Sequence, residues 1–110
     1  MSYIFHITEG STWREQQSKE GYKPNAFEDE GFIHASDKST VLGVYDRYYK
    51  NKSGLTLLVI DTGKLTSEVK REPTPNGEFP HIFGEINKDS IEAVLAIDSE
   101  LGLAQILEKY

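Results

Sequence analysis

Three histidines lie in apolar stretches that have the composition of β-strands. The stretches read Tyr-Ile-Phe-His-Ile-Thr around His6, Gly-Phe-Ile-His-Ala-Ser around His34, and Phe-Pro-His-Ile-Phe-Gly-Glu around His81. Imidazole donates and accepts hydrogen bonds, moves protons near neutral pH and binds metals. A single histidine in a strand is as often a hydrogen-bonded core residue as it is a functional one. Three in the same setting predict a histidine-lined cleft.

Neighbouring polar side chains extend this candidate site. Strand alternation places Thr8 on the same face as His6, Ser36 on the same face as His34, and Glu85 on the same face as His81. Arg47 lies on a predicted helix and offers a positive charge to a phosphate. We therefore predict His6, His34, His81 and Glu85 as catalytic residues and His6, Thr8, Ser36 and Arg47 as ligand-binding residues. The competing roles are a helix cap for Ser36 and an exposed strand-end acid for Glu85.

Composition narrows the class of protein. The 110 residues fit one domain, 1–110, and the net charge of −6 gives no reason to expect nucleic acid or anionic lipid as a partner. The absence of cysteine excludes disulfides and thiolate zinc sites. The apolar runs of the sequence, such as residues 57–60, are too short to span a membrane. We expect a soluble, cytoplasmic protein whose partner is a small molecule, with no prediction of a protein partner.

The predicted elements follow from periodicity and turn signals. Thr12 is a predicted N-cap because Glu15 follows at capping-box spacing, and Val41, Val44, Tyr45 and Tyr48 form an apolar helical face with Tyr48 in the core. Ser36 or Asp37 is the expected cap of that helix. Strands are expected at 3–8, 31–36, 55–61 in the centre, 68–72 at an edge, 81–86 and 91–97; helices at 12–20, 37–50 and 100–109; and loops at 25–30 and 73–77.

This element order predicts an α+β fold with a split, curved, mainly antiparallel sheet and two helices from the N-terminal half. A doubly wound nucleotide-binding fold is disfavoured because no helix separates the last strands. The chain also has no glycine-rich phosphate loop.

Five motifs together resemble the domain-of-unknown-function 952 family. They are Tyr-Ile-Phe-His-Ile-Thr, Glu-Gly-Phe-Ile-His-Ala-Ser, Val-Leu-Gly-Val before Arg47-Tyr48-Tyr49, Leu-Leu-Val-Ile-Asp, and Glu-Phe-Pro-His-Ile-Phe-Gly-Glu-Ile. The resemblance covers about residues 2–97 and leaves 98–110 as a C-terminal extension. It implies an ADP-ribosyltransferase-like fold, whose cleft holds NAD in active relatives, rather than an established activity.

That fold resemblance implies roles for two residues. Phe5-His6-Ile7-Thr8 is similar to the Tyr-His-Gly-Thr motif of the histidine class of ADP-ribosyltransferases, which implies that His6 contacts the NAD ribose. Ile7 replaces the glycine of that motif. Glu85 would orient the ribose hydroxyl and stabilise the positive charge that develops as nicotinamide leaves. The implied function is binding of NAD or another ADP-ribose-containing nucleotide, with ADP-ribosyl or phosphoryl transfer.

Three alternatives stay open. The pattern His-x-Thr/Ser occurs twice, at His6 and at His34, as in two-histidine phosphoesterases, although no duplicated lobe is visible. A metal-dependent hydrolase would use His6, His34, His81 and Glu85 as ligands, without any short ligand spacing. The cleft could also belong to a non-catalytic module that binds a nucleotide or metabolite. Whether the chain is an enzyme is therefore left open, and so is its cofactor, with NAD as the candidate.

Overall fold

Strand β4, Leu55–Asp61, is the centre of the fold, as predicted. The computed structural model describes residues 2–24 and 26–110. β4 is buried along its whole length between β1, Tyr3–Glu9, and β8, Ile91–Ile97, and pairs antiparallel with both. Its run of Leu, Val and Ile suits a strand covered on both faces.

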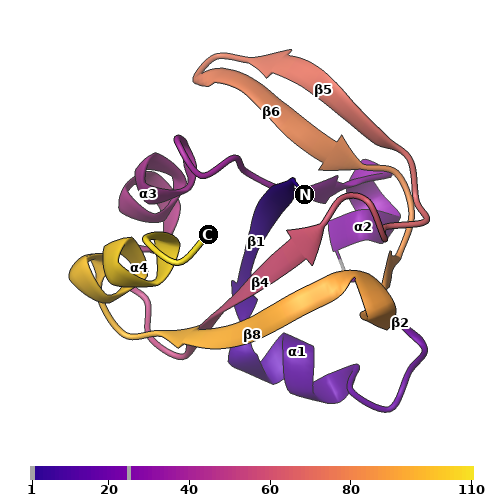
Figure 1. Ribbon diagram of the computed structural model, residues 1–110, viewed down its shortest axis with the longest axis horizontal. Helices are drawn as coiled ribbons and strands as arrows, with labels where there is room; N and C mark the ends of the chain where they lie inside the picture. Colours follow the sequence, from indigo (N-terminus) through magenta and orange to yellow (C-terminus); the bar gives the residue numbers. More distant parts are fainter. Residues whose placement is uncertain (1, 25) are drawn as a thin grey trace.

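A second three-stranded sheet lies beside the first. It has the order β3, Ile33–His34, then β6, Gly77–Ile82, then β5, Val69–Thr74, and all its pairs are antiparallel. The long β5–β6 hairpin projects away from β1, β4 and β8 (Figure 1). Backbone hydrogen bonds of 2.8 and 2.7 Å between Phe5 and Ser36 join the two sheets. A short pair, β2, Gly21–Tyr22, and β7, Ile86–Asn87, completes the strands.

The helices are short. They are α1, Gly10–Glu15; α2, Ala26–Glu30; α3, Val41–Val44, which continues into a π-helical turn η1, Tyr45–Tyr49; the 3-10 turn η2, Lys88–Ser90; and α4, Glu100–Leu107. The predicted C-terminal helix is confirmed, and Ser99 caps it by accepting a 2.9 Å hydrogen bond from the Gly102 N–H. The α+β class with mainly antiparallel sheets is confirmed.

Two expectations in the N-terminal half are wrong. α1 begins at Gly10, directly after β1, so Thr12 lies inside the helix and is not its cap. The segment expected as the loop 25–30 contains helix α2; residue 25 lies outside the described residues.

The central sheet separates two cores because side chains alternate along its strands. Phe5, Ile7 and Leu57 face the core covered by α3 and α4, whereas Ile4 and Leu58 face the core beneath the second sheet. Trp13 packs against the latter core and places α1 on that face. Both faces of β1 are therefore packed against a core.

The hairpin differs from expectation at its turn. Thr74 pairs with Gly77, so the segment predicted as an unpaired loop closes a tight turn, in which Gly77 has φ +119°. Pro73 is tolerated because β5 is an edge strand, as predicted. β6 therefore begins at Gly77 and ends at Ile82, not at Ile86. The expected alternation from His81 to Glu85 breaks at that point.

Candidate functional site

A cleft of about 920 Å³ lies between the β1 edge, strand β3, the β5–β6 hairpin and η1. Six of the predicted site residues line it: His6, Thr8, His34, Ser36, Arg47 and His81. The structure thus brings the three histidines together. The prediction that Glu85 joins them is wrong: Glu85 follows the end of β6 and lines a separate hollow beside Gly21.

His6 is a neutral imidazole with an unused acceptor. Its Nδ1–H donates to the His34 carbonyl at 2.6 Å, which leaves Nε2 as an acceptor. Among the described residues, that buried Nε2 has no hydrogen-bond partner. Burial lowers the pKa of His6 to about 4, although the bond to His34 acts in the opposite direction. A hydroxyl or N–H group of a ligand would satisfy this nitrogen.

His81 forms a pair with a carboxylate that the sequence did not single out. Its Nδ1–H donates to Glu72 Oε1 at 2.7 Å, and its buried Nε2 also lacks a partner among the residues described. The ring stacks on Phe32, with centroids 4.2 Å apart and planes at 21°. The imidazole is thus held on one side by charge and on one face by an aromatic ring.

His34 connects these two histidines. Its carbonyl binds His6, and its ring meets the His81 ring edge-to-face with centroids 5.2 Å apart. The side chain itself is exposed, and Nε2 pairs with Glu30 Oε2 at the end of α2. Glu30, which falls in the segment expected as the loop 25–30, therefore belongs to the cleft.

The hydroxyl groups have different roles from those predicted. Thr8 Oγ1 accepts a 2.7 Å bond from the Tyr22 hydroxyl, whose pKa burial raises to about 12, so the phenol keeps its proton. Ser36 joins the sheets through its backbone, and α3 has Thr40 as its N-cap residue, without a side-chain cap bond. The cap predicted at Ser36 or Asp37 is therefore wrong.

The helical wall presents positive charge and an aromatic ring. Tyr48 is 58% exposed and lines the cleft, so its predicted core position is wrong. The π-helical turn adds a residue per turn and shifts the buried series from Val41 and Tyr45 to Tyr49. Arg47 and Lys52 lie over the rings of Tyr48 and Tyr49, at 5.8 and 5.6 Å, and line the same wall.

The edge of β1 is open where it meets the cleft. Phe5 exchanges both backbone bonds with Ser36, and in an antiparallel strand the groups two residues on point the same way. The N–H and C=O of Ile7 therefore face the cleft, and no described segment pairs with them there. The Ile7 side chain packs in the core instead.

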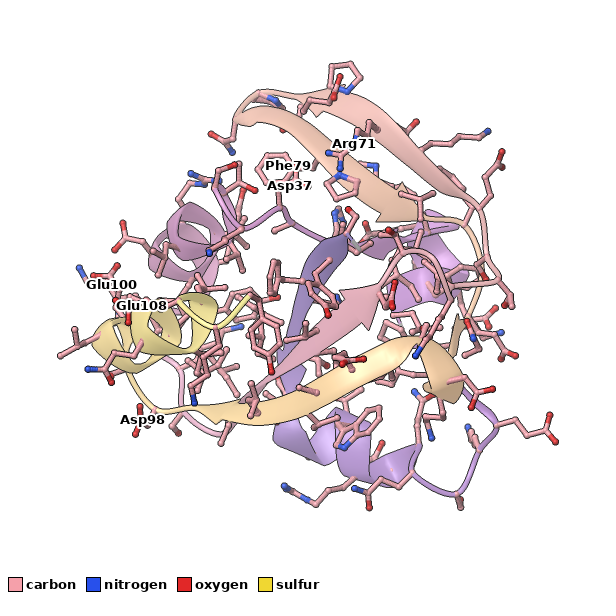
Figure 2. All side chains as sticks on the ribbon, in the orientation of Figure 1. Asp37, Arg71, Phe79, Asp98, Glu100 and Glu108 are labelled. Carbon is pink, nitrogen blue, oxygen red and sulfur yellow. The ribbon has the colours of Figure 1, made fainter. Side chains whose placement is uncertain are left out.

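An ion pair fixes the hairpin over the cleft. Arg71 on β5 donates to both carboxylate oxygens of Asp37 at 2.7 and 2.9 Å, and the two side chains meet beneath the hairpin (Figure 2). The Asp37 carboxylate raises the pKa of Arg71. This bidentate contact connects the strand that carries Glu72 to the segment that follows His34.

Two of the alternatives find little support in this geometry. In the described part of the chain, no three His, Asp or Glu side chains are arranged to hold a metal ion. The two His-x-Thr/Ser motifs are not equivalent, since the His6 ring is buried and the His34 ring is exposed.

None of the helices in residues 2–24 and 26–110 has the length and apolar character needed to cross a membrane.

Sequence reasoning missed Glu72, Glu30 and Phe32. The signal for Glu72 was the turn at Pro75-Asn76: pairing Thr74 with Gly77 places Glu72 opposite Phe79 and diagonal to His81. Glu30 ends α2 and His34 lies on β3, so their contact over four residues is not the helical pair that this spacing would predict. No comparable signal marks the stacking of Phe32 on His81.

Fold and cleft together define a small α+β domain with an imidazole-lined pocket. The chain is similar to protein CC0527 from Caulobacter crescentus. Its crystal structure aligns with a TM-score of 0.80 at 18% identity over 88% of this chain and 87% of that chain. Its solution NMR structure aligns with a TM-score of 0.75 at 20% identity, over 89% of this chain and 86% of that chain. No curated protein matches. Residues 7–94 match the family described as "Protein of unknown function (DUF952)", so the chain belongs to that family.

Proposed function

We propose that the cleft binds NAD or another ADP-ribose-containing nucleotide. The observation that carries this proposal is the buried, neutral ring of His6, a residue of the cleft lining whose Nε2 acceptor has no partner among the described residues. A ribose hydroxyl is a suitable donor for it, and a buried acceptor without a partner costs roughly 1–3 kcal/mol. The volume of the cleft also falls in the range of small-molecule and cofactor sites.

The other parts of the nucleotide have matching groups on the cleft walls. Arg47 and Lys52 supply two positive charges for the diphosphate, in a chain whose net charge is −6. The exposed Tyr48 ring offers a surface for a base. The open N–H and C=O of Ile7 suit a carboxamide, which carries one acceptor and one donor. Nicotinamide has such a group.

The resemblance of the N-terminal motif to ADP-ribosyltransferases favours the same ligand. The glycine replaced by Ile7 does not obstruct this, because the Ile7 side chain points into the core. Transfer to a protein acceptor has less support, since the predicted carboxylate, Glu85, lies outside the cleft. Binding is therefore the function that we propose, and catalysis is a separate question.

Titration of the nitrogen-15-labelled protein with NAD tests this proposal by NMR. We expect saturable shifts of the backbone amides of Ile7, His34 and His81, and of the backbone amides of η1. His6→Asn keeps an N–H donor for the His34 carbonyl but removes the Nε2 acceptor, so it should weaken binding on the order of tenfold.

Charge supplies the matched controls. Arg47→Ala should weaken NAD binding, whereas Arg14→Ala, the same change on α1 outside the cleft, should not. Adenosine, which lacks the diphosphate, should bind both charge variants equally. Absence of shifts at millimolar NAD would refute the proposal.

A further inference from the structure

We propose that Glu72 and His81 form a carboxylate–imidazole dyad that activates water, so that the cleft hydrolyses the N-glycosidic bond of the nucleotide it binds. The inference rests on the proposed function for its substrate. Its own basis is the geometry of the dyad.

The first step is the tautomer of His81. Glu72 accepts the Nδ1 proton at 2.7 Å, which leaves the Nε2 lone pair free. A carboxylate in this position holds the ring in orientation and stabilises the imidazolium that forms when Nε2 takes a proton. Nε2 is buried, is without a partner among the described residues, and belongs to a ring that lines the cleft.

The second step is rigidity. His81 lies within β6, paired with His34 on one side and Lys70 on the other, and its ring stacks on Phe32. A general base must be held within hydrogen-bond reach of the proton that it removes. The neighbouring imidazole, His34, already pairs with Glu30. His81 is therefore the histidine that combines a carboxylate at Nδ1 with an Nε2 that has no partner among the described residues.

The third step is the position of the base relative to the sugar. His34 bonds through its carbonyl to His6 and contacts His81 through its ring. A ribose whose hydroxyl donates to His6 Nε2 would therefore lie in the cleft that His81 also lines, with His34 in contact with both histidines. This places a base near the sugar rather than near the Arg47 wall.

The reaction balances with one base and no acid. Water attacks C1′ of the nicotinamide ribose while His81 Nε2 accepts one of its protons. The bond between C1′ and the pyridinium nitrogen breaks, and its electron pair leaves with nicotinamide, which becomes neutral. The products are ADP-ribose and nicotinamide, and imidazolium returns its proton to solvent. Because the leaving group departs neutral, no proton donor is required.

Two variants and one control test the dyad in the intact protein with NAD as the probe. His81→Gln should lower the rate of nicotinamide release, measured by chromatography, by about 10²–10⁴-fold. Glu72→Gln keeps an acceptor for Nδ1–H but removes the charge, so it should lower the rate on the order of tenfold or more. Glu68→Gln removes an equal charge from an exposed residue that pairs with Lys70, and its rate should equal that of the unchanged protein.

A spectroscopic measurement separates a positioning role of Glu72 from loss of folding. Long-range nitrogen-15 spectra of the imidazoles should show His81 as the Nδ1–H tautomer, and Glu72→Gln should populate the Nε2–H tautomer with the backbone amide spectrum unchanged. An Nε2–H tautomer in the unchanged protein would overturn the dyad.

The outcomes distinguish the two proposals. Saturable NAD binding without nicotinamide release would overturn hydrolysis and leave the binding function intact. Absence of NAD binding would overturn both. Release that is equal in Glu72→Gln and Glu68→Gln would show that another group is the base and would also overturn the dyad.

Discussion

The buried His6 should make the stability of this domain fall at mildly acidic pH. Its folded-state pKa is about 4, because burial disfavours the imidazolium, whereas an unfolded histidine has a pKa near 6.5. Above pH 6.5 the ring is neutral in both states and contributes no pH dependence. As the pH falls below 6.5, the unfolded chain binds a proton that the folded protein does not, so stability is lost until about pH 4.

The magnitude follows from the two pKa values. A difference of about 2.5 between them corresponds to about 3 kcal/mol of unfolding free energy, since each pKa unit is worth about 1.4 kcal/mol. This is a large share of the roughly 5–15 kcal/mol typical of a domain.

Urea unfolding of the unchanged protein and of His6→Asn, between pH 7.5 and 4, measures this effect. Other groups titrate in both proteins, so the difference between the two curves isolates the His6 contribution. We expect the unchanged protein to lose about 3 kcal/mol relative to His6→Asn over this range. His34→Asn removes an exposed imidazole from the same cleft and is the matched control. A flat difference for His6→Asn would refute both the buried neutral ring and the acceptor on which nucleotide binding rests.

Two further predictions concern the hairpin. Arg71→Ala breaks the bidentate contact with Asp37; both side chains are partly exposed, so we expect a loss of about 0.5–1 kcal/mol in urea unfolding, and a loss above 3 kcal/mol would contradict this assignment. Gly77→Ala forces a side chain into φ +119° at the turn and should cost about 1–3 kcal/mol, measured by thermal unfolding; an unchanged midpoint would show that the turn can relax.

Strand alternation predicted the centre of the fold well because β1 and β4 separate two cores. Each residue of β4 is buried, and successive side chains of β1 enter opposite cores, so the apolar pattern carries the information directly. The histidines at positions 6, 34 and 81 were found for a related reason. A polar ring in an otherwise apolar strand is conspicuous in any sequence.

The same reasoning failed where the backbone leaves its regular period. The π-helical turn moves Tyr48 from the core to the cleft, and the end of β6 at Ile82 moves Glu85 to a separate hollow beside Gly21. An extra residue per turn, or a strand that stops, changes the face of every later side chain. Gly84, a residue type that weakens the interior of a strand, lies just after the end of β6, whereas the π-helical turn has no such signal in the residue types around it.

The cleft depends on pairings between segments distant in sequence, which explains why its acids were harder to find than its histidines. Glu72 and His81 meet only because the turn at Gly77 sets the register of the hairpin, and His34 meets His81 only because β3 pairs with β6. Had a two-residue turn at Pro75-Asn76 been predicted between Thr74 and Gly77, the diagonal contact of Glu72 with His81 would have followed. The pairing of β3 with β6 would not, since two residues carry too little pattern to specify a partner. The carboxylate of the dyad was thus within reach of sequence reasoning, whereas the cluster of rings around it required the fold.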